Sequence, residues 1–455
     1  MTAIVLFKNN LRISDNPVLF HAASKYDILP IYIKDDINTT KPIGASSRYW
    51  LFHALESLNK KLDNHLQFYY GDTFSIIKNL ASKHNVSTIY CEEPFLDSEI
   101  TFFNDIKKSL EFLNIKLKFY NCTLLWKPYE ILKNDNSPYQ VFTPFYKNSC
   151  LNASLPSAPL GEPKIINYHQ DRHSTNINDL NLLDEYAWHH KFDNIWDISE
   201  DAASLIFSHF LDVKINDYKK ERDFPSLDKN SKLSPYIRFG LISVNRIWYE
   251  LQKLENNSGV DHFKSEIGWR EFSYYLLYHF PSMEQNNLQK KFDNFDWENS
   301  DEKFQAWKKG QTGYPIVDAG MRELWNTGFI HNRVRMVVAS FLVKNLLIDW
   351  RLGEKWFWDC LVDADYASNI AGWQWVAGSG ADAAPYFRIF SPILQGQKFD
   401  PDGEYIKHYV PELRNIPIKH LNEPWNYESQ SNYVVPIIDY KYSRQRALEK
   451  YAEIK

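Results

Sequence analysis

Strand-type and helix-type patterns of hydrophobic residues alternate over the first 120 residues of the chain. The strand-type runs span residues 3–7, 28–33, 66–70, 87–90 and 116–120, and the helix-type patterns span 45–62, 73–84 and 98–113. This alternation predicts an α/β domain with a parallel, five-stranded, Rossmann-like sheet. Such sheets bind ligands at the carboxyl ends of their strands, so Lys8-Asn9-Asn10 after the first run is either a ligand-binding loop or an ordinary solvated one.

The hydrophobic pattern then changes twice. From about residue 131 to residue 195 the periodicity is lost and Asn, Ser and Pro accumulate, which predicts a surface connector. After residue 196 strand signals vanish and amphipathic helical patterns dominate, as in residues 332–347. We therefore expect an α/β domain over residues 1–130, a connector over 131–195 and a large all-helical domain over 196–455.

The composition is that of a globular protein. The chain has 455 residues, of which 44% are hydrophobic, but no apolar run reaches the roughly 18 to 20 residues that span a bilayer. The first 30 residues lack a signal-peptide pattern, so we expect a cytoplasmic protein without membrane association. A net charge of -5 excludes an overall basic coat but is compatible with a locally basic cleft. The four cysteines have no metal-ligand or disulfide spacing, which predicts reduced thiols and no metal.

Known nucleotide-binding loops are missing from the sequence. Neither G-x-G-x-x-G nor G-x-x-x-x-G-K-[ST] occurs, so a nucleotide cofactor must be held in another way. The polar turn of Asn230, Ser231, Lys232 and Ser234 precedes a predicted helix and offers hydroxyl, amide and backbone N–H groups. This turn is either an anion site or only a helix cap.

Two later segments combine charged and aromatic side chains. On the predicted helix 264–280, Glu266, Trp269 and Arg270 share one face, as a functional patch or as an ion pair covered by an indole. Residues 331–336 open an apolar helix with Asn332, Arg333 and Arg335, whose natural partners are Asp363 and Asp365. The same two aspartates are compatible with a metal site of a nucleotide-sugar transferase, although no nucleotide loop accompanies them.

Tryptophan is concentrated in the second half of the chain. Three of the 15 tryptophans precede residue 195 and twelve follow it. Trp373 and Trp375 are two residues apart, so on a helix one side chain faces the core while the other faces a cleft. Such a pair suits interior electron transfer and stacking on a flat ligand, or simple packing.

These segments together resemble the photolyase/cryptochrome family, and within it the bacterial class I cyclobutane pyrimidine dimer photolyases. The resemblance covers essentially the whole chain. It is carried by LFKNNLRISDNPVL, SEIGWREF, GQTGYPIVDAGMREL, TGFIHNRVRM, NLLIDWRLGE, GWQWVAGSGADAAPYFRIFSP and GEYIKHYVPEL.

The resemblance implies that the helical domain holds FAD, which is reduced in the active form. The implied cofactor-binding residues are Tyr218, Asn230, Ser231, Lys232, Leu233, Ser234, Phe263, Arg270, Asn332, Arg335, Asp363 and Asp365. Arg335 and Asp363 are implied to pair beside the flavin ring, and Asn369 to face the flavin N5. The chain departs from the family at Lys229 and Asn230, which replace a common Gly and Thr, and at Phe263 and Phe329, which are often Trp.

The activity implied is that of a deoxyribodipyrimidine photo-lyase, a carbon-carbon lyase. Reduced FAD is implied to donate an electron to a dimer flipped out of UV-damaged DNA, and Glu266, protonated in the complex, to bind that dimer. Trp269 and Trp375 match the pocket walls and Met336 its floor, while Arg222, Arg333 and Arg388 match positions near the DNA backbone. Trp373, Trp350 and Trp297 match the family's photoreduction chain.

A second chromophore of folate or deazaflavin type is compatible with Glu99, although the lysine associated with folate is missing near residues 281–286. We expect a monomer without an obligate protein partner. Two alternatives on the same scaffold are a cryptochrome-type blue-light photoreceptor and a (6-4) photoproduct photolyase. The first often carries a long C-terminal extension, and the second relies on paired histidines where this chain has His331, Asn332 and Met336.

Overall fold

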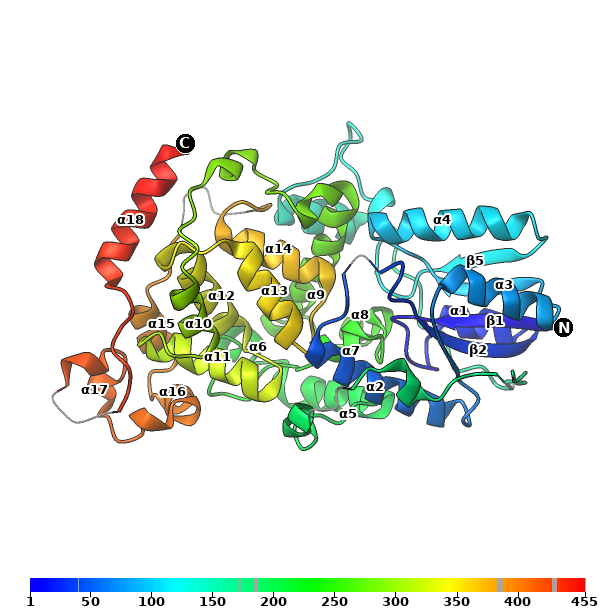
Figure 1. Cartoon of the computed structure of the whole chain (residues 1–455), viewed down its shortest axis with the longest axis horizontal. Coiled ribbons are helices and arrows are strands. Elements are labelled where there is room, and N and C mark those ends of the chain that lie inside the picture. Colours follow the sequence, from blue (N-terminus) through cyan, green and yellow to red (C-terminus); the bar gives the residue numbers. More distant parts are fainter. Residues whose placement is uncertain (40, 172, 184–186, 383–387, 428–431, 455) are drawn as a thin grey trace.

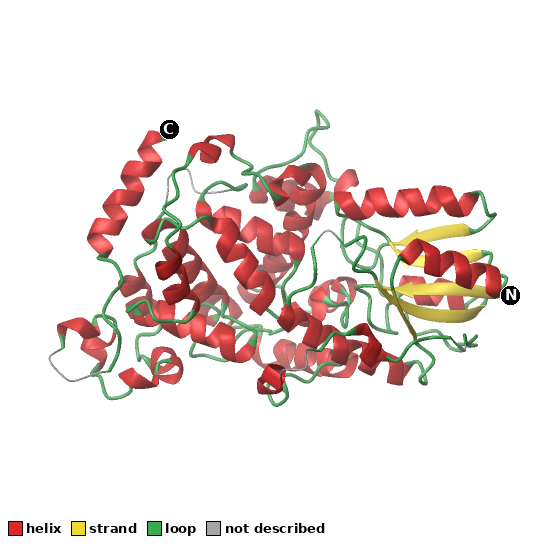
Figure 2. Ribbon diagram, viewed as in Figure 1, coloured by secondary structure: helices red, strands yellow, loops and turns green. Residues whose placement is uncertain are grey.

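The computed structural model describes residues 1–39, 41–171, 173–183, 187–382, 388–427 and 432–454. Strands are gathered at one end of the molecule and helices fill the rest (Figure 2). The N-terminus lies at the sheet end and the C-terminus at the opposite end (Figure 1). Within the described ranges, no helix is long and apolar enough to cross a membrane.

The sheet is parallel, with strand order β3-β2-β1-β4-β5. Its strands are β1 (Thr2–Phe7), β2 (Asp27–Lys34), β3 (Gln67–Tyr70), β4 (Thr88–Glu92) and β5 (Lys116–Tyr120). Helices of this domain are α1 (Pro17–Ala23), α2 (Ala45–Lys61), α3 (Thr73–Lys83) and α4 (Asp97–Glu111). The predicted five-stranded parallel sheet is therefore confirmed.

Helix α1 was not predicted, because seven residues are too few to show a helical period. Its local signals are nevertheless in the sequence: Asn16 accepts a hydrogen bond from the Leu19 N–H at 3.1 Å, and Pro17 is the first helical residue. Both are typical of a helix start.

Helix α2 joins the α/β domain to the helical domain. It begins after Gly44, where a Cβ atom would lie 2.0 Å from the carbonyl oxygen of Trp358. One turn later, the Ser47 hydroxyl donates to the Leu361 carbonyl at 2.9 Å. The two domains therefore pack directly against each other instead of being held only by the connector.

The connector lies against the sheet. Its described part contains only short 3-10 and π segments: η2 (Pro144–Ser149), η3 (Cys150–Asn152), η4 (Ile177–Leu180) and η5 (Ala187–Phe192). The Ile28 N–H donates to Asn167 at 2.8 Å, and the Thr175 N–H donates to Phe68 at 2.9 Å. These bonds hold the chain on β2 and β3. We propose 1–130, 131–195 and 196–455 as the domain and connector boundaries.

The described residues after Tyr120 contain no strand, which confirms the all-helical second domain. Its α-helices are α5 (Glu200–His209), α6 (Tyr218–Glu221), α7 (Ser234–Arg238), α8 (Val244–Gln252), α9 (Ser258–His279), α10 (Asp301–Lys308), α11 (Pro315–Thr327), α12 (Asn332–Ser340), α13 (Trp350–Cys360), α14 (Tyr366–Ala377), α15 (Pro392–Phe399), α16 (Glu404–Tyr409), α17 (Ile418–Leu421) and α18 (Tyr440–Glu453). The remaining short segments are η1 (Pro128–Glu130), η6 (Phe210–Lys214), η7 (Pro281–Glu284), η8 (Lys290–Asn294), η9 (Phe341–Asn345), η10 (Pro411–Leu413) and η11 (Pro424–Asn426).

Candidate functional site

A pocket in the helical domain collects side chains from five segments that are far apart in the sequence. They are α6, the turn 230–234, α9, the start of α12 and residues 363–368. The lining does not include Asn369, but it includes all twelve residues implied to bind the cofactor: Tyr218, Asn230, Ser231, Lys232, Leu233, Ser234, Phe263, Arg270, Asn332, Arg335, Asp363 and Asp365. The structure thus brings this predicted set together in one place.

An ion pair stands at one side of the pocket. Nη2 of Arg335 donates to both carboxylate oxygens of Asp363, at 3.0 and 2.8 Å, as expected from the sequence. The Ser234 hydroxyl donates to the same carboxylate at 2.5 Å. Asp363 is buried, so these charge-assisted bonds compensate for its desolvation. Arg333 does not share these aspartates; it pairs with Asp223 instead.

Asp365 is the second buried carboxylate of the pocket. The Tyr274 hydroxyl donates to it at 2.7 Å, and its other oxygen accepts from the Ser368 N–H at 2.8 Å, which caps α14. Burial acts to raise the pKa of Asp365, but the nearby cations Arg270 and Arg238 outweigh burial and lower this pKa. The pocket therefore holds a carboxylate next to two arginines.

The turn before α7 supplies hydroxyl and backbone groups. Lys232 has a φ of 53°, in the left-handed region that a lysine rarely adopts, and the Leu233 N–H donates to the Ser231 hydroxyl at 3.4 Å. This conformation turns the chain so that residues 230–234 all line the pocket. The short polar side chains of Asn230, Ser231 and Ser234 are suited to contact phosphate oxygens.

Glu266 lies in the pocket wall and pairs with Arg222. Arg222 Nη2 donates to Glu266 Oε2 at 3.1 Å, and a second, closer contact joins the same two groups. The family resemblance implies that Arg222 lies near the DNA backbone. In the structure Arg222 is buried, with 7% of its surface exposed. Both carboxylate oxygens of Glu266 therefore already have a partner in Arg222.

Asn369 faces a polar group of the neighbouring helix. Its Nδ2 donates to Oε1 of Glu354 on α13 at 2.7 Å and to the Glu354 carbonyl at 3.1 Å. Glu354 in turn pairs with Lys41 from the α/β domain. The amide of Asn369 is thus held by its nitrogen, which fixes its orientation.

The groups around the pocket match a cofactor that combines phosphates with a flat polar ring. Hydroxyls, an amide and Lys232 are available to phosphates, whereas the Arg335–Asp363 pair presents a donor and an acceptor to a ring edge. No G-x-G-x-x-G loop is needed for this arrangement.

A second hollow lies outside the pocket and is basic. Four cations line it together with Asp223: Lys220, Arg333, Arg388 and Lys398. The Arg333 guanidinium also lies 4.4 Å from the centre of the Phe399 ring. Arg333 and Arg388, two of the three arginines expected at a DNA backbone, therefore line the same hollow, whereas Arg222 does not line it.

Of the residues expected to enclose a flipped-out dimer, Trp269, Met336 and Trp375 are not among those that line the pocket. Trp269 stacks on Phe142 of the connector, with ring centres 3.9 Å apart, so one of its faces is covered. Trp373 is buried, and Trp375, which packs against the same hydrophobic cluster, is partly exposed. Met336 is partly buried, with its sulfur 4.0 Å from Arg333 Nη1.

The three tryptophans of the expected electron route share one region of the fold. Trp373 and Trp350 belong to the same buried cluster, and Trp297 packs against it. A Cβ atom at Gly353 would lie 2.2 Å from the Trp373 ring, so glycine lets this indole rest on α13 one turn after Trp350. The Trp350 Nε1–H donates to Asn287 at 3.0 Å.

The sequence reasoning missed several residues of this region. Trp307 is fully buried, 6.3 Å from Trp373 between ring centres, and Phe357 lies 4.9 Å from Trp373. Arg238 lines the pocket, and its Nε donates to the Ala364 carbonyl at 3.0 Å. The position of Arg238 within SPYIRFG, next to the predicted anion turn, was the available signal.

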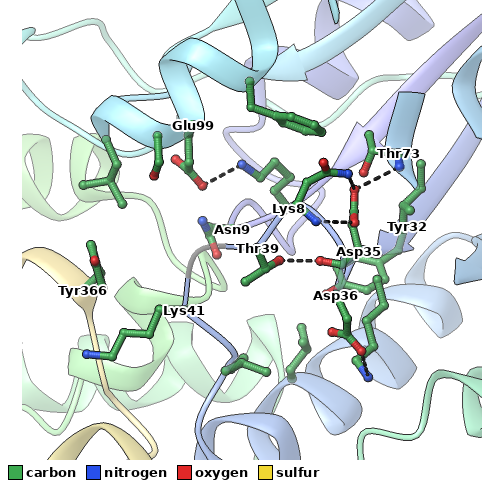
Figure 3. Close-up of a pocket in the computed structure, with 18 of the residues that line it drawn as sticks. Lys8, Asn9, Tyr32, Asp35, Asp36, Thr39, Lys41, Thr73, Glu99 and Tyr366 are labelled. Atoms are coloured by element: carbon green, nitrogen blue, oxygen red, sulfur yellow. Dashed lines mark hydrogen bonds and ion pairs between the residues drawn. The ribbon is translucent and has the colours of Figure 1, made fainter. Parts of the chain in front are cut away.

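A separate pocket opens where the strands of the sheet end (Figure 3). Lys8 and Asn9 line it, as the topology of parallel sheets predicts for the loop after β1, whereas Asn10 is buried. Lys8 Nζ donates to Glu99 at 2.8 Å. Burial raises the pKa of Asp35, but hydrogen bonds from Asn38 and Thr73 outweigh it, and the pKa falls below the ordinary value.

Arg238 and Tyr366 from the helical domain complete the lining of the pocket at the strand ends. Arg238 thus borders both pockets, and its Nη1 donates to the Asn9 side chain at 2.7 Å.

Comparisons with known proteins match both domains. Residues 3–164 match the family model described as DNA photolyase, and residues 263–453 match the FAD binding domain of DNA photolyase. A deoxyribodipyrimidine photo-lyase from Agrobacterium fabrum is 39% identical over 99% of this chain and 98% of its own length. Cryptochrome-2 from Arabidopsis thaliana is 33% identical over 97% of this chain and 77% of its own length.

Solved structures agree. A bacterial class III photolyase from Agrobacterium tumefaciens superimposes with a TM-score of 0.95 at 38% identity, covering 100% of this chain and 97% of that one. An archaeal photolyase from Sulfolobus tokodaii with two FAD molecules gives a TM-score of 0.86 at 29% identity, with 100% of both chains covered.

Proposed function

This chain belongs to the DNA photolyase family and carries that family's FAD-binding domain, and from this premise we propose that it repairs cyclobutane pyrimidine dimers in UV-damaged DNA under light. The enzyme would be a deoxyribodipyrimidine photo-lyase, as its full-length relatives are named. The observation that carries the proposal is the position of Glu266. It lines the same pocket as the Arg335–Asp363 pair, so a lesion-binding carboxyl group and a flavin-type donor set face one cavity.

The residues of the pocket are suited to hold FAD. Asn230, Ser231, Lys232 and Ser234 would contact the phosphates, and Arg335 with Asp363 would fix the edge of the ring. When bound and reduced, FAD would supply the light-excited electron that splits the dimer. Asn369 is held in place by Glu354, which presets the direction of its amide oxygen.

On the substrate side, Glu266 would bind the extruded lesion. A dimer is weakly paired and stacked, so its extrusion costs less free energy than that of an intact base pair. Trp269 has one face covered by Phe142, which leaves the other face and Trp375 as the proposed aromatic walls. Met336 would form the floor.

DNA itself would bind to the basic hollow. Arg333 and Arg388 lie there with Lys220 and Lys398, so a local cluster of cations compensates for the net charge of -5. Each phosphate neutralised releases counterions, and binding should therefore weaken steeply as salt rises.

A cryptochrome-type photoreceptor is the second candidate, because a cryptochrome matches almost the whole chain. Repair of the (6-4) photoproduct is less supported, since His331 is buried and its Nδ1 accepts from the Arg333 N–H as the cap of α12. The class within the family, a monomeric state and a cytoplasmic location stay predictions.

We also propose that the pocket at the strand ends holds a second, light-harvesting chromophore. Its lining combines aromatic rings with Lys8, Lys41, Asp35 and Glu99, which suits a flat heteroaromatic molecule with polar edges (Figure 3). Folate, deazaflavin and flavin types all satisfy this description, and the archaeal relative binds two FAD molecules.

The test is a light-dependent repair assay on an oligonucleotide with one thymine dimer, using protein whose flavin content is known from its absorption spectrum. Illumination of the reduced protein should restore the thymines, and darkness should not. A matched (6-4) oligonucleotide should stay unrepaired. Flavin binding without repair of either lesion would favour the photoreceptor.

A further inference from the structure

His262 lies one helical turn before Glu266 on α9 and lines a groove outside the pocket. Its Nε2 is 2.9 Å from Arg222 Nη1 and 3.6 Å from Glu266 Oε1. The side chains of His262 and Glu266 are 36% and 31% exposed, whereas that of Arg222 is 8% exposed. Solvent therefore reaches the histidine more readily than the arginine beneath it.

The contact with Arg222 fixes the protonation of His262. A guanidinium is always charged and can only donate hydrogen bonds. Nε2 of His262 must therefore be the acceptor at 2.9 Å, so the ring is neutral with its proton on Nδ1. In this state one arginine is held by two acceptors, the imidazole of His262 and the carboxylate of Glu266.

We propose that His262 is a positioning residue for lesion repair: as a neutral acceptor it anchors Arg222 against Glu266, and its protonation breaks this anchor and redirects Glu266 away from the lesion. The inference rests on the proposed repair function. It adds a residue and a pH-dependent control to the lesion site.

The change on protonation follows from the same distances. A proton on Nε2 removes the acceptor for Arg222 and places two cations 2.9 Å apart, so Arg222 must move. The new N–H then has Glu266 Oε1 at 3.6 Å as its closest anionic partner. Glu266 would be held by a cation on its own helix, and its carboxyl group would be less available to the substrate.

The charged groups around His262 are of mixed sign. Burial, followed by the charge of Arg222, lowers the pKa of His262 below the ordinary 6.5, while Glu266 and Asp223 act in the opposite direction. The groups that face it from α6, the following turn, its own helix and the groove outside are Tyr218, Lys219, Arg222, Asp223, Asp261, Lys264, Glu266 and Lys147. The neutral form therefore dominates near pH 7, and the cation forms in acid.

His262 is also placed to exchange protons with bulk water. It lines an outer groove whose other walls include the exposed Lys147, Lys219 and Ser258, whereas Glu266 lines the inner pocket. The pair thus connects solvent to the lesion-binding carboxyl group without a path through the hydrophobic core.

The experiment measures the quantum yield of dimer splitting by the reduced, FAD-loaded enzyme at saturating DNA, between about pH 8 and about pH 5, together with the Kd for DNA at each pH. The wild-type yield should fall by about threefold in acid, while His262→Gln, whose amide oxygen still accepts from Arg222, should give a flat profile. His262→Phe removes the acceptor and should lower the yield at every pH. His279→Gln, also on α9 but bonded to the Pro128 carbonyl at 3.1 Å, is the matched control and should keep the wild-type profile.

A wild-type profile in His262→Gln, or a yield in His262→Phe equal to that of wild type, would overturn the inference. Absence of repair by wild type at every pH would instead reject the proposed function. Flavin content and DNA affinity, measured on each variant, separate a loss of fold from a loss of positioning.

Discussion

One nitrogen of Arg335 donates to both carboxylate oxygens of Asp363, at 3.0 and 2.8 Å, while this carboxylate is almost completely shielded from solvent. The pair is therefore a single unit: neither partner can be removed without leaving a charge in the pocket.

Asp363→Asn should weaken FAD binding by more than about tenfold, because breaking a buried ion pair costs roughly 3 to 5 kcal/mol. The flavin-to-protein ratio after purification and the Kd for added FAD measure the effect. Asp402→Asn, at an exposed position, is the control and should bind FAD normally. Equal flavin content in both variants would contradict the role of the pair.

Glu266→Ala should lower the quantum yield of repair by about tenfold, since a hydrogen bond to a charged group contributes roughly 1.5 to 3 kcal/mol. The Kd for damaged DNA should change much less, because the phosphate contacts lie in the basic hollow. Photochemical repair and a binding titration on the same oligonucleotide separate the two quantities. Glu255→Ala, on the exposed surface, should alter neither. A loss confined to affinity would argue against this role.

Trp350→Phe should reduce photoreduction of bound, oxidised FAD to a small fraction of the wild-type rate and leave repair by chemically reduced enzyme intact. Trp350 is the middle residue of the expected route, and phenylalanine is much harder to oxidise than indole. Trp356→Phe changes the same helix near the surface, where Trp356 stacks on the exposed Trp325, and is the control. If photoreduction persists in Trp350→Phe but is lost in Trp307→Phe, the electron travels through Trp307 instead.

Lys344→Met should raise the free energy of unfolding at neutral and acidic pH. Burial, followed by the charge of Arg388, lowers the pKa of Lys344 to about 7, so the folded state holds fewer protons than the unfolded state between this value and the ordinary 10.5. Wild-type stability attributable to this group therefore rises with pH across that window and is least below it.

The gain in Lys344→Met should be about 1 to 3 kcal/mol at about pH 6 and smaller at about pH 9, measured by urea denaturation. Lys309→Met removes an exposed charge and should have little effect at either pH. If the increase in the free energy of unfolding were instead larger at higher pH, Lys344 would not be a buried cation at low pH.

The strands and the long helices could be predicted from the sequence because their hydrophobic periods are complete. The five strands were found as short β-branched and aromatic runs, whereas α1 has only seven residues and its signal is in its cap. The predicted helix 332–347 was right in type, but it widens into a π-helical turn at Phe341–Asn345, which hydrophobic periodicity cannot distinguish.

The members of the site could be predicted, but not all of their pairings. Arg335 and Asp363 pair as expected, whereas Arg333 pairs with Asp223, 110 positions away in sequence. Arg222 was expected near a DNA backbone and is buried beside Glu266, because α6 packs on α9, a tertiary contact that the local sequence does not reveal. His262 was not predicted either, because its contact with Arg222 is also tertiary.

Arg238 bonds to Asn9 of one domain and to the Ala364 backbone of the other, and it borders both ligand pockets. If each pocket held a chromophore, the distance between the two would be set by these hydrogen bonds of Arg238 and not by the length of residues 131–195. Energy transfer between chromophores falls steeply with their separation. Inserting residues into segment 131–195 should therefore leave the transfer efficiency unchanged, whereas weakening the Arg238 hydrogen bonds should lower it.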